Sequence, residues 1–272
     1  MALVALNEDT PSTVDPVDPA GSTPVVSSDL VIEGLSKRFG AGDTILDGLD
    51  LQVPRGQALA IIGANGAGKS TLLRCCLRLI EPDGGRVNLL SHDTTRARAR
   101  DLKRIRSLVG FVFQRHNLVP RLTSLTNVLH GSLGRGGGLR CWHQALAPAD
   151  RRREAFACLD RVGLQHVALQ RADQLSGGQS QRVAIARMLM QRPELVMADE
   201  PVASLDPIAG EEVMALLTEL MRSQGLTLVF TTHNLRHAVD YADRIVGLRR
   251  GKVELDCPAQ GQRAQDLEEI YG

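Results

Sequence analysis

Eight consecutive residues have the types and spacing that hold phosphate groups. They are, in order, Gly63, Ala64, Asn65, Gly66, Ala67, Gly68, Lys69 and Ser70. Glycines let the backbone curl so that several N–H groups point at one anion, and a helix N-terminus adds partial positive charge. Lys69 would reach the β- and γ-phosphates, and Ser70 would ligate Mg²⁺. The pattern therefore predicts a nucleoside triphosphate site.

The neighbours of this loop provide the context that such a motif needs. Residues 59–62 are all apolar, as in a buried strand, and residues 71–80 have the spacing of a helix. A strand, a glycine-rich loop and a helix in this order place the loop around a phosphate. Thr71, the first residue of the helical stretch, is expected to contact the nucleotide as well. An ordinary glycine-rich turn is the plain alternative.

Two acids, Asp199 and Glu200, directly follow the apolar residues 195–198. The carboxyl ends of parallel strands are where open sheets bind ligands, and a buried carboxylate must be paired or coordinated. In a nucleoside triphosphatase, Asp199 would hold Mg²⁺ and Glu200 would act on the attacking water. The pair could equally cap the helix that follows, so on its own it leaves both interpretations open.

A second glycine-rich sequence precedes another helical stretch, residues 180–190. It consists of Leu175, Ser176, Gly177, Gly178 and Gln179. By itself it predicts a helix capped by Ser176, yet a hydroxyl and two glycine amides at a helix N-terminus also make an anion site. These residues resemble the signature of ATP-binding-cassette (ABC) ATPases. The phosphate loop upstream and the acidic pair downstream strengthen that resemblance.

The resemblance extends to four further positions. Phe39 is similar to the aromatic residue that stacks on adenine, although a lone phenylalanine is more often part of a core. Gln114, directly after the predicted strand 109–113, is similar to the glutamine that senses Mg²⁺ and the water. Asp206 matches the end of a loop that crosses the dimer interface, and His233 matches the histidine that contacts the γ-phosphate.

Membership of this family would imply a shared mechanism. ATP and Mg²⁺ would be bound by the phosphate loop, and the signature of a second copy would close over the γ-phosphate in a head-to-tail dimer. Ser176 and Gly178 of that copy would complete the charge stabilisation, and Glu200 would be the general base or orient the water. The chain is thus expected to be an ATP hydrolase.

Three features favour an importer subunit among the cassette proteins. The chain has no run of 18 or more apolar residues, so no membrane helices are fused to the ATPase. Residues 170–174 lack the Glu-rich loop that is typical of exporters, and no regulatory β-domain follows Val253.

Longer stretches resemble the ATPase subunit of phosphonate importers. They are residues 110–119, 125–131, 171–175, 198–207, 241–248 and 269–272. The resemblance covers residues 30–272 and implies phosphonate, or a close phosphorus oxyanion such as phosphite, as the cargo. Ser180 and the surroundings of His233 depart from the family pattern without removing a catalytic group. An importer ATPase does not touch its cargo, so this assignment depends on family likeness alone.

The importer interpretation also implies partners and a location. Permease subunits would be direct partners, a periplasmic or extracellular solute-binding protein an indirect one, and the ATPase would lie peripherally on the cytoplasmic face of the bacterial inner membrane. A soluble ABC-type ATPase accessory to a cytosolic phosphonate-degrading complex, and an importer ATPase for another small solute, remain alternatives that neighbouring genes would separate. The net charge of +1 gives no reason to expect nucleic acid as a partner.

The elements that position these residues indicate an α/β fold. Apolar runs of strand type alternate with helical stretches, which predicts a mostly parallel, buried core sheet. Residues 30–32 and 46–53 should form antiparallel strands before the phosphate loop. The later strands are expected at residues 87–90, 109–113, 195–198, 226–230 and 245–248, and helices at 179–190, 211–222 and 235–241.

The chain is expected to form one ABC nucleotide-binding domain, residues 29–272. A helical subdomain at about 115–191 would lack strands, and its segment 116–129 is expected to carry the permease docking groove. Residues 1–28, rich in Pro, Asp, Ser and Thr, are expected to be a disordered tail. The five cysteines have no C-x-x-C spacing and indicate neither a zinc site nor disulfides. The arginine-rich residues 96–106 are predicted to form a solvated helix face.

Overall fold

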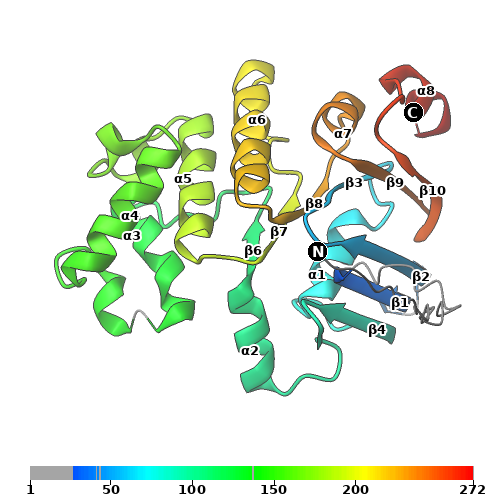
Figure 1. The fold of residues 1–272 in the computed structure, drawn as a ribbon, viewed down its shortest axis with the longest axis horizontal. Helices are drawn as coiled ribbons and strands as arrows, with labels where there is room; N and C mark the ends of the chain where they lie inside the picture. Colours follow the sequence, from blue (N-terminus) through cyan, green and yellow to red (C-terminus); the bar gives the residue numbers. More distant parts are fainter. Residues whose placement is uncertain (1–26, 41, 43, 137, 272) are drawn as a thin grey trace, which may run out of the picture.

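A six-stranded sheet forms the centre of the protein (Figure 1). The computed structural model describes residues 27–40, 42, 44–136 and 138–271. The strand order is β10-β9-β3-β8-β7-β6, in which β10 is antiparallel to β9 and the other neighbours are parallel. The strands are β3 (Ala58–Ile62), β6 (Val109–Val112), β7 (Leu195–Asp199), β8 (Thr227–Thr231), β9 (Arg244–Arg249) and β10 (Lys252–Pro258). The predicted mostly parallel α/β core is confirmed.

Every residue of β3, β7 and β8 is buried, because both faces of the sheet are covered. In β3, Ala58, Ala60 and Ile62 face one core, whereas Leu59 and Ile61 face the other. Side chains that alternate between two apolar cores explain why the strands are continuous apolar runs and not alternating ones. The phosphate loop therefore starts from a strand that is buried on both faces.

An antiparallel sheet covers one face of the central sheet. Its order is β2-β1-β4-β5, formed by β1 (Ser28–Arg38), β2 (Thr44–Pro54), β4 (Gly84–Leu89) and β5 (His92–Asp93). Helix α1 (Lys69–Cys76) lies in the core between the two sheets, with Leu72, Leu73, Cys75 and Cys76 buried. This helix ends earlier than the predicted residue 80. The four-residue difference is a short turn in which Arg78 has a φ of 50°.

Three helices cover the opposite face (Figure 1). They are α6 (Pro207–Ser223), α7 (Leu235–Tyr241) and α8 (Ala264–Tyr271). Apolar residues of α6, among them Val213, Met214 and Leu217, join the core that β3, β7 and β8 line on this side. The sequence prediction placed α7 correctly, began α6 four residues late, and did not include β10 or α8.

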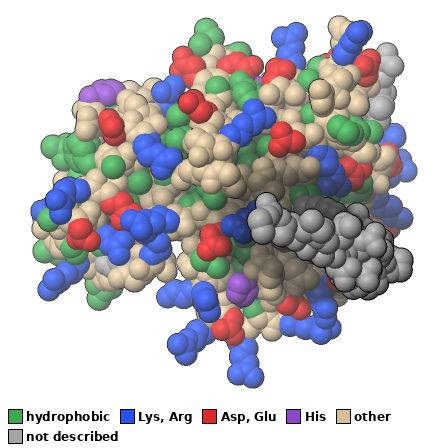
Figure 2. Space-filling view, viewed as in Figure 1, with side chains coloured by type: hydrophobic (Ala, Val, Ile, Leu, Met, Phe, Trp, Pro, Cys, Tyr) green, Lys and Arg blue, Asp and Glu red, His purple; other side chains and the backbone are tan. Residues whose placement is uncertain are grey.

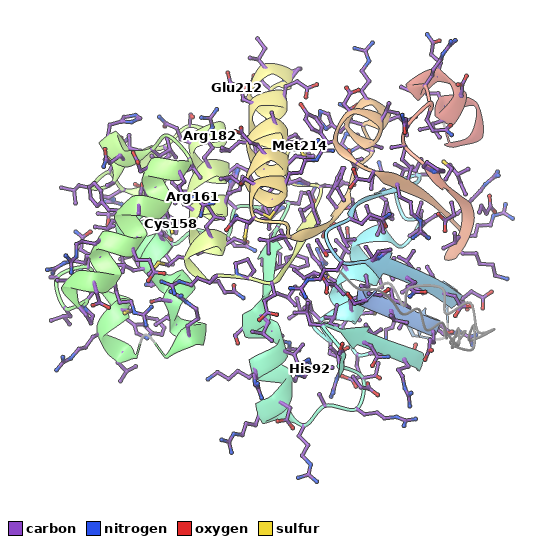
Figure 3. All side chains as sticks on the ribbon, in the orientation of Figure 1. His92, Cys158, Arg161, Arg182, Glu212 and Met214 are labelled. Atoms are coloured by element: carbon purple, nitrogen blue, oxygen red, sulfur yellow. The ribbon has the colours of Figure 1, made fainter. Side chains whose placement is uncertain are left out.

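Most of the remaining helices gather at one end of the central sheet, at the left of Figure 1. They are α3 (Ser124–Leu129), η1 (His130–Arg135), η2 (Leu139–Trp142), α4 (Ala149–Arg161), η3 (Gln165–Val167), η4 (Ala172–Gln174) and α5 (Gly177–Met190). Helices α3, α4 and α5 pack against one another. The described residues of the interval 115–191 contain no strand, apart from an isolated bridge between Thr123 and Arg171. Arg182 of α5 and Glu212 of α6 form an ion pair at 2.6 Å that joins this unit to the central sheet's helices (Figure 3).

Helix α2 (Ala99–Leu108) projects below the central sheet in Figure 1 and overlaps residues 96–106, which the sequence predicted to form a solvated helix face. It buries Leu102 and Ile105 and exposes Arg100, Lys103 and Arg104. Lysine and arginine side chains stand out along this edge of the molecule in Figure 2. None of these three forms an ion pair with another described residue.

The N-terminal boundary differs from the prediction by one residue. Strand β1 already begins at Ser28, whose hydroxyl accepts a hydrogen bond from the Gln52 amide at 2.7 Å. Residues 1–26 of the predicted tail lie outside the described part of the chain. No described helix combines the length and the apolar character needed to cross a bilayer.

Candidate active site

The phosphate loop leaves β3 at Gly63 and enters α1 at Gly68, and both positions require glycine. At Gly63 a Cβ atom would lie 2.4 Å from the Leu248 carbonyl oxygen, and at Gly68 it would lie 2.8 Å from that of Ile45. Both residues also have positive φ angles, 147° and 102°. No side chain caps the N-terminus of α1. Its N–H groups thus face the loop, as an anion site needs.

Lys69 is buried, and its ammonium group is held inside the loop. The Nζ atom donates hydrogen bonds to the carbonyl oxygens of Gly63 at 2.8 Å and Ala64 at 3.3 Å. It lies 3.6 Å from a carboxylate oxygen of Glu200, and both side chains are largely shielded from solvent. A buried ammonium needs a partner of opposite charge, which here is the acid that follows β7.

Asp199 ends β7 and joins the loop's helix to two neighbouring strands. Its Oδ1 atom accepts hydrogen bonds from the Ser70 hydroxyl at 2.7 Å and the Thr231 hydroxyl at 3.0 Å. Its Oδ2 atom accepts one from Arg74 at 3.3 Å. The side chain that caps the following helix, α6, is Asp206. The interpretation of the acidic pair as a helix cap is therefore wrong.

A cavity of about 360 Å³ lies over the phosphate loop. Seven consecutive residues of the loop and of α1, Asn65 to Thr71, line it. The other lining residues are Phe39, Ile45, Gln114 and Glu200. Phe39 is half exposed, so it is not part of the core. The structure thus brings together residues that are far apart in the chain, from the end of β1, the phosphate loop, the end of β6 and the end of β7.

Glu200 also borders a second cavity, of about 350 Å³, on its other side. Asp206 and His233 line this cavity, and the Nδ1 atom of His233 lies 3.4 Å from the second carboxylate oxygen of Glu200. His233 follows the end of β8 and is more than half exposed. Glu200 therefore stands between Lys69 on one side and His233 on the other.

Two further titratable groups, His237 and Tyr241, lie near this second cavity. Burial lowers the pKa of His237, against the opposing effect of Glu211, whose carboxylate lies 3.5 Å from Nε2. Burial and a 2.8 Å hydrogen bond donated to Glu211 raise the pKa of Tyr241 to about 12. Both rings are therefore neutral at pH 7.

The signature residues 176–179 line neither of the two cavities. Ser176 caps α5 with a reciprocal pair: its hydroxyl accepts from the Gln179 N–H at 3.2 Å, and the Gln179 side chain accepts from the Ser176 N–H at 3.0 Å. Gly177 packs against Leu205, where an added Cβ would lie 3.1 Å from a methyl group, and Gly178 lies beside Ala209. Ser176 and Gly177 are exposed. None of residues 176–179 lines the cavity of the same chain's phosphate loop.

Sequence reasoning missed Thr231, Arg74 and Ile45 at this site. Thr231 is a polar residue that ends the apolar run of β8, and it pairs in register with Asp199 on β7. A polar residue at the carboxyl end of a strand is expected to lie at the same sheet edge as Asp199, and this signal could have identified Thr231. Arg74 and Ile45 carry no such signal, because only the packing of α1 and β2 brings them to the site.

A groove of about 450 Å³ separates the central sheet from the helical unit. Its walls are the turn after α1, helix α2, strand β6 and residues of η1 and α5, including Leu79, Lys103, Phe111, His130 and Arg187. Of the segment 116–129, in which the sequence analysis placed a docking groove, only Asn117 lines it.

Comparison with known protein families gives one match that spans the site. The model of the ABC transporter family matches residues 46–203, which include the phosphate loop, the signature and the acidic pair.

The curated relatives resemble the chain over nearly its full length. A phosphonates import ATP-binding protein of Synechococcus is 48% identical over 89% of this chain and 90% of its own length. The corresponding protein of Bordetella parapertussis is 47% identical over 91% of this chain and 98% of its own. That of Alcaligenes faecalis is 46% identical over 89% and 88%, respectively.

Solved structures have the same fold. The ATP-binding cassette MJ0796, in a dimeric post-hydrolysis state bound to ADP and phosphate, superposes with a TM-score of 0.73 at 34% identity, covering 86% of this chain and all of that one. CbiO1 of Clostridium perfringens, part of a transporter complex, superposes with a TM-score of 0.76 at 28% identity, covering 90% and 92%.

Proposed function

This chain belongs to the ABC transporter family, and we propose that it is the ATP-hydrolysing subunit that powers the import of phosphonates or phosphite-like oxyanions. The observation that carries the cargo assignment is the 46–48% identity, over most of both chains, to relatives named for phosphonate import. The ATPase assignment has independent support in the geometry around Lys69 and Glu200. The domain we propose begins with β1 at Ser28 and extends to residue 272, with a helical subdomain at about 115–191.

We propose that Lys69 exchanges its loop contacts for the β- and γ-phosphates when ATP binds. The carbonyl oxygens of Gly63 and Ala64 now accept its hydrogen bonds, and a phosphate oxygen in the loop would replace them with stronger, charge-assisted ones. Phe39 would stack on adenine, since its ring is half exposed at the rim of the same cavity. The amides of residues 63–68 would hold the phosphates.

Ser70 and Asp199 fit a magnesium ion. A hydroxyl and a carboxylate oxygen 2.7 Å apart, at the rim of the phosphate loop, are the hard oxygen donors that Mg²⁺ prefers. When bound, the ion would offset the charge of the β- and γ-phosphates. Gln114 lines the same cavity and would complete the set of polar groups around it.

Glu200 is the group that we assign to the attacking water. Its carboxylate lies between Lys69 and His233 and borders both cavities, so it can accept a proton from water placed beside the γ-phosphate. His233 would contact the γ-phosphate from the other side. Phosphoryl transfer of this kind depends on positioning and electrostatics more than on covalent chemistry.

A second copy of the chain would complete each site. The signature is exposed and does not line its own chain's phosphate cavity, while the related cassette MJ0796 is dimeric. We propose a head-to-tail dimer with two ATP molecules, in which Ser176, Gly177, Gly178 and Gln179 of one copy close over the γ-phosphate held by the other. Asp206 would lie at that interface.

The groove between the central sheet and the helical subdomain is our candidate for the permease docking surface. It would place the chain at the cytoplasmic face of the bacterial inner membrane, with a solute-binding protein as an indirect partner. Leu79 lines the groove and is 47% exposed, so its apolar side chain is open to contact with a partner. A Leu79→Glu variant should lose coupled transport but keep its basal ATPase rate. Leu169→Glu, at an exposed leucine outside the groove, is the matched control and should transport normally.

The cargo is tested by growth. A strain that lacks this chain should fail to grow on an organophosphonate as the sole phosphorus source and should grow normally on phosphate. The parent chain should rescue it, and a Lys69→Ala copy should not. Normal phosphonate and phosphite uptake in the deletion strain, with no redundant cassette present, would contradict the cargo and leave the ATPase assignment standing.

A further inference from the structure

The hydroxyl of Thr231 lies between the two carboxylate residues of the site. Thr231 is fully buried at the end of β8, in register with Asp199 on β7. Its Oγ1 atom accepts a hydrogen bond from the backbone N–H of Glu200 at 2.9 Å and is 3.0 Å from Oδ1 of Asp199. An N–H can only donate, so the hydroxyl's single proton is directed to the aspartate.

Glu200 has a backbone that needs such support. Its φ angle is 44°, in the left-handed region that residues other than glycine, asparagine and aspartate rarely occupy. Strain of this kind persists only where the surroundings hold it in place. The hydrogen bond to Thr231 fixes the peptide group that leads into Glu200, and thereby the direction in which its side chain leaves β7.

The hydroxyl also restrains Asp199. The Oδ1 atom that accepts from Thr231 accepts from Ser70 as well, so the carboxylate is held from the sheet side and from the helix side. Loss of the Thr231 hydroxyl would remove one of the three side-chain hydrogen bonds to Asp199 and, at the same time, the hydrogen bond to the backbone N–H of Glu200.

We propose that Thr231 is a positioning residue for ATP hydrolysis: its hydroxyl fixes Glu200 and Asp199 relative to each other. This inference rests on the proposed function, since it assigns Thr231 a role only through those two residues. Because Thr231 does not line the ATP cavity, it should govern the rate of the bound complex and not the affinity for ATP.

The same strand offers a matched control. Thr227, at the other end of β8, is equally buried, donates to Asp29 at 2.5 Å and accepts from the N–H of Gly56 at 2.7 Å. Its hydroxyl thus has the same two kinds of partner, a buried aspartate and a backbone N–H, far from the phosphate loop. Thr231→Val and Thr227→Val remove equivalent hydrogen bonds from one strand, so only their positions differ.

The experiment compares kcat, KM for ATP and melting temperature in the full-length chain. Misplacement of a catalytic group by about an ångström lowers rates on the order of a hundredfold, so Thr231→Val should lower kcat by about 10- to 100-fold with KM changed less than about threefold. Thr231→Ser keeps the hydroxyl and should restore kcat to within about threefold of the parent. Thr227→Val should melt at a lower temperature than the parent yet retain its kcat.

Three results would overturn the inference. They are an unchanged kcat in Thr231→Val, a kcat loss of the same size in Thr227→Val, and a failure of Thr231→Ser to restore activity. If Thr231→Val does not fold, Thr231→Cys, with a weaker hydrogen-bonding group of similar size, should show a reduced kcat at unchanged KM. A parent chain without ATPase activity would instead contradict the proposed function, so the two failures are distinguishable.

Discussion

The N-termini of α1 and α5 are both glycine-rich, yet only that of α5 is capped by side chains. At α1 no side chain caps the helix, the lysine is buried, and a cavity of about 360 Å³ lies over the loop. At α5 the Ser176 hydroxyl and the Gln179 side chain cap each other's backbone, and the turn is exposed. One helix end is left open to an anion within its own chain, and the other is satisfied without one.

This difference explains how one sequence could hold the two anion sites that we propose without competition between them. The α1 site has its charges in place before a ligand arrives, because Lys69 is already paired with Glu200. The α5 site has only neutral groups, whose hydrogen bonds are internal and must be exchanged when a phosphate approaches. We therefore expect ATP to bind first at α1, and the signature to act only when a second copy brings it there.

The largest effect should follow a change at α1. Lys69→Ala removes the one ammonium group inside the phosphate loop and leaves Glu200 without its partner. ATP affinity should fall by more than about 100-fold, and hydrolysis should disappear, because a charge-assisted contact to phosphate is lost in a buried site. Calorimetric titration with ATP measures this. Lys252→Ala, at an exposed lysine paired with Asp47, should bind ATP as the parent does.

A change at α5 should separate binding from hydrolysis. Gly178→Asp places a carboxylate where a γ-phosphate would approach, and the neighbouring Ala209 leaves room for its Cβ at 3.4 Å. Hydrolysis should fall to below about 1% of the parent rate, because like charges repel at the closed site. ATP affinity of the single chain should change less than about threefold. Equal loss of both would show that the signature belongs to the same chain's binding site.

The smallest effect concerns the cap itself. Gln179→Ala removes one half of the reciprocal pair with Ser176, so the free energy of unfolding should fall by about 0.5–1 kcal/mol. Urea denaturation measures that change, and ATP affinity serves as the control that should not move. A loss of more than about 3 kcal/mol would mean that α5 depends on contacts other than this cap.

Much of this arrangement could be predicted from the sequence, for reasons that the two helix ends make plain. The phosphate loop and the signature are local: glycines, a serine and a following helix determine their own shape. The continuous apolar runs of β3, β7 and β8 likewise indicate a sheet buried on both faces. Asp199 and Glu200 stood out because acids rarely end such a strand.

Other features could not be predicted from the sequence, because they depend on packing between distant segments of the chain. The left-handed backbone of Glu200 and its hydrogen bond to Thr231 arise from the register of β7 with β8. Arg74 reaches Asp199 only because α1 lies between the two sheets. The groove that we propose for docking has walls from α2, β6 and α5, whose meeting no local pattern reveals. The sequence instead pointed to the segment 116–129, of which only Asn117 lines this groove.

The central claim, that each ATP site is shared by two copies, is tested most directly by the mass of a Glu200→Gln chain in solution. This variant keeps Lys69 and Ser70 but lacks the carboxylate that we assign to the attacking water, so bound ATP should persist and hold two copies together. Light scattering should give the mass of one chain, 29.5 kDa, without nucleotide and twice that mass with ATP and Mg²⁺. Addition of Gly178→Asp should return the protein to a single chain with ATP still bound. A Glu200→Gln chain that binds ATP and Mg²⁺ yet stays at the mass of one chain would contradict the account.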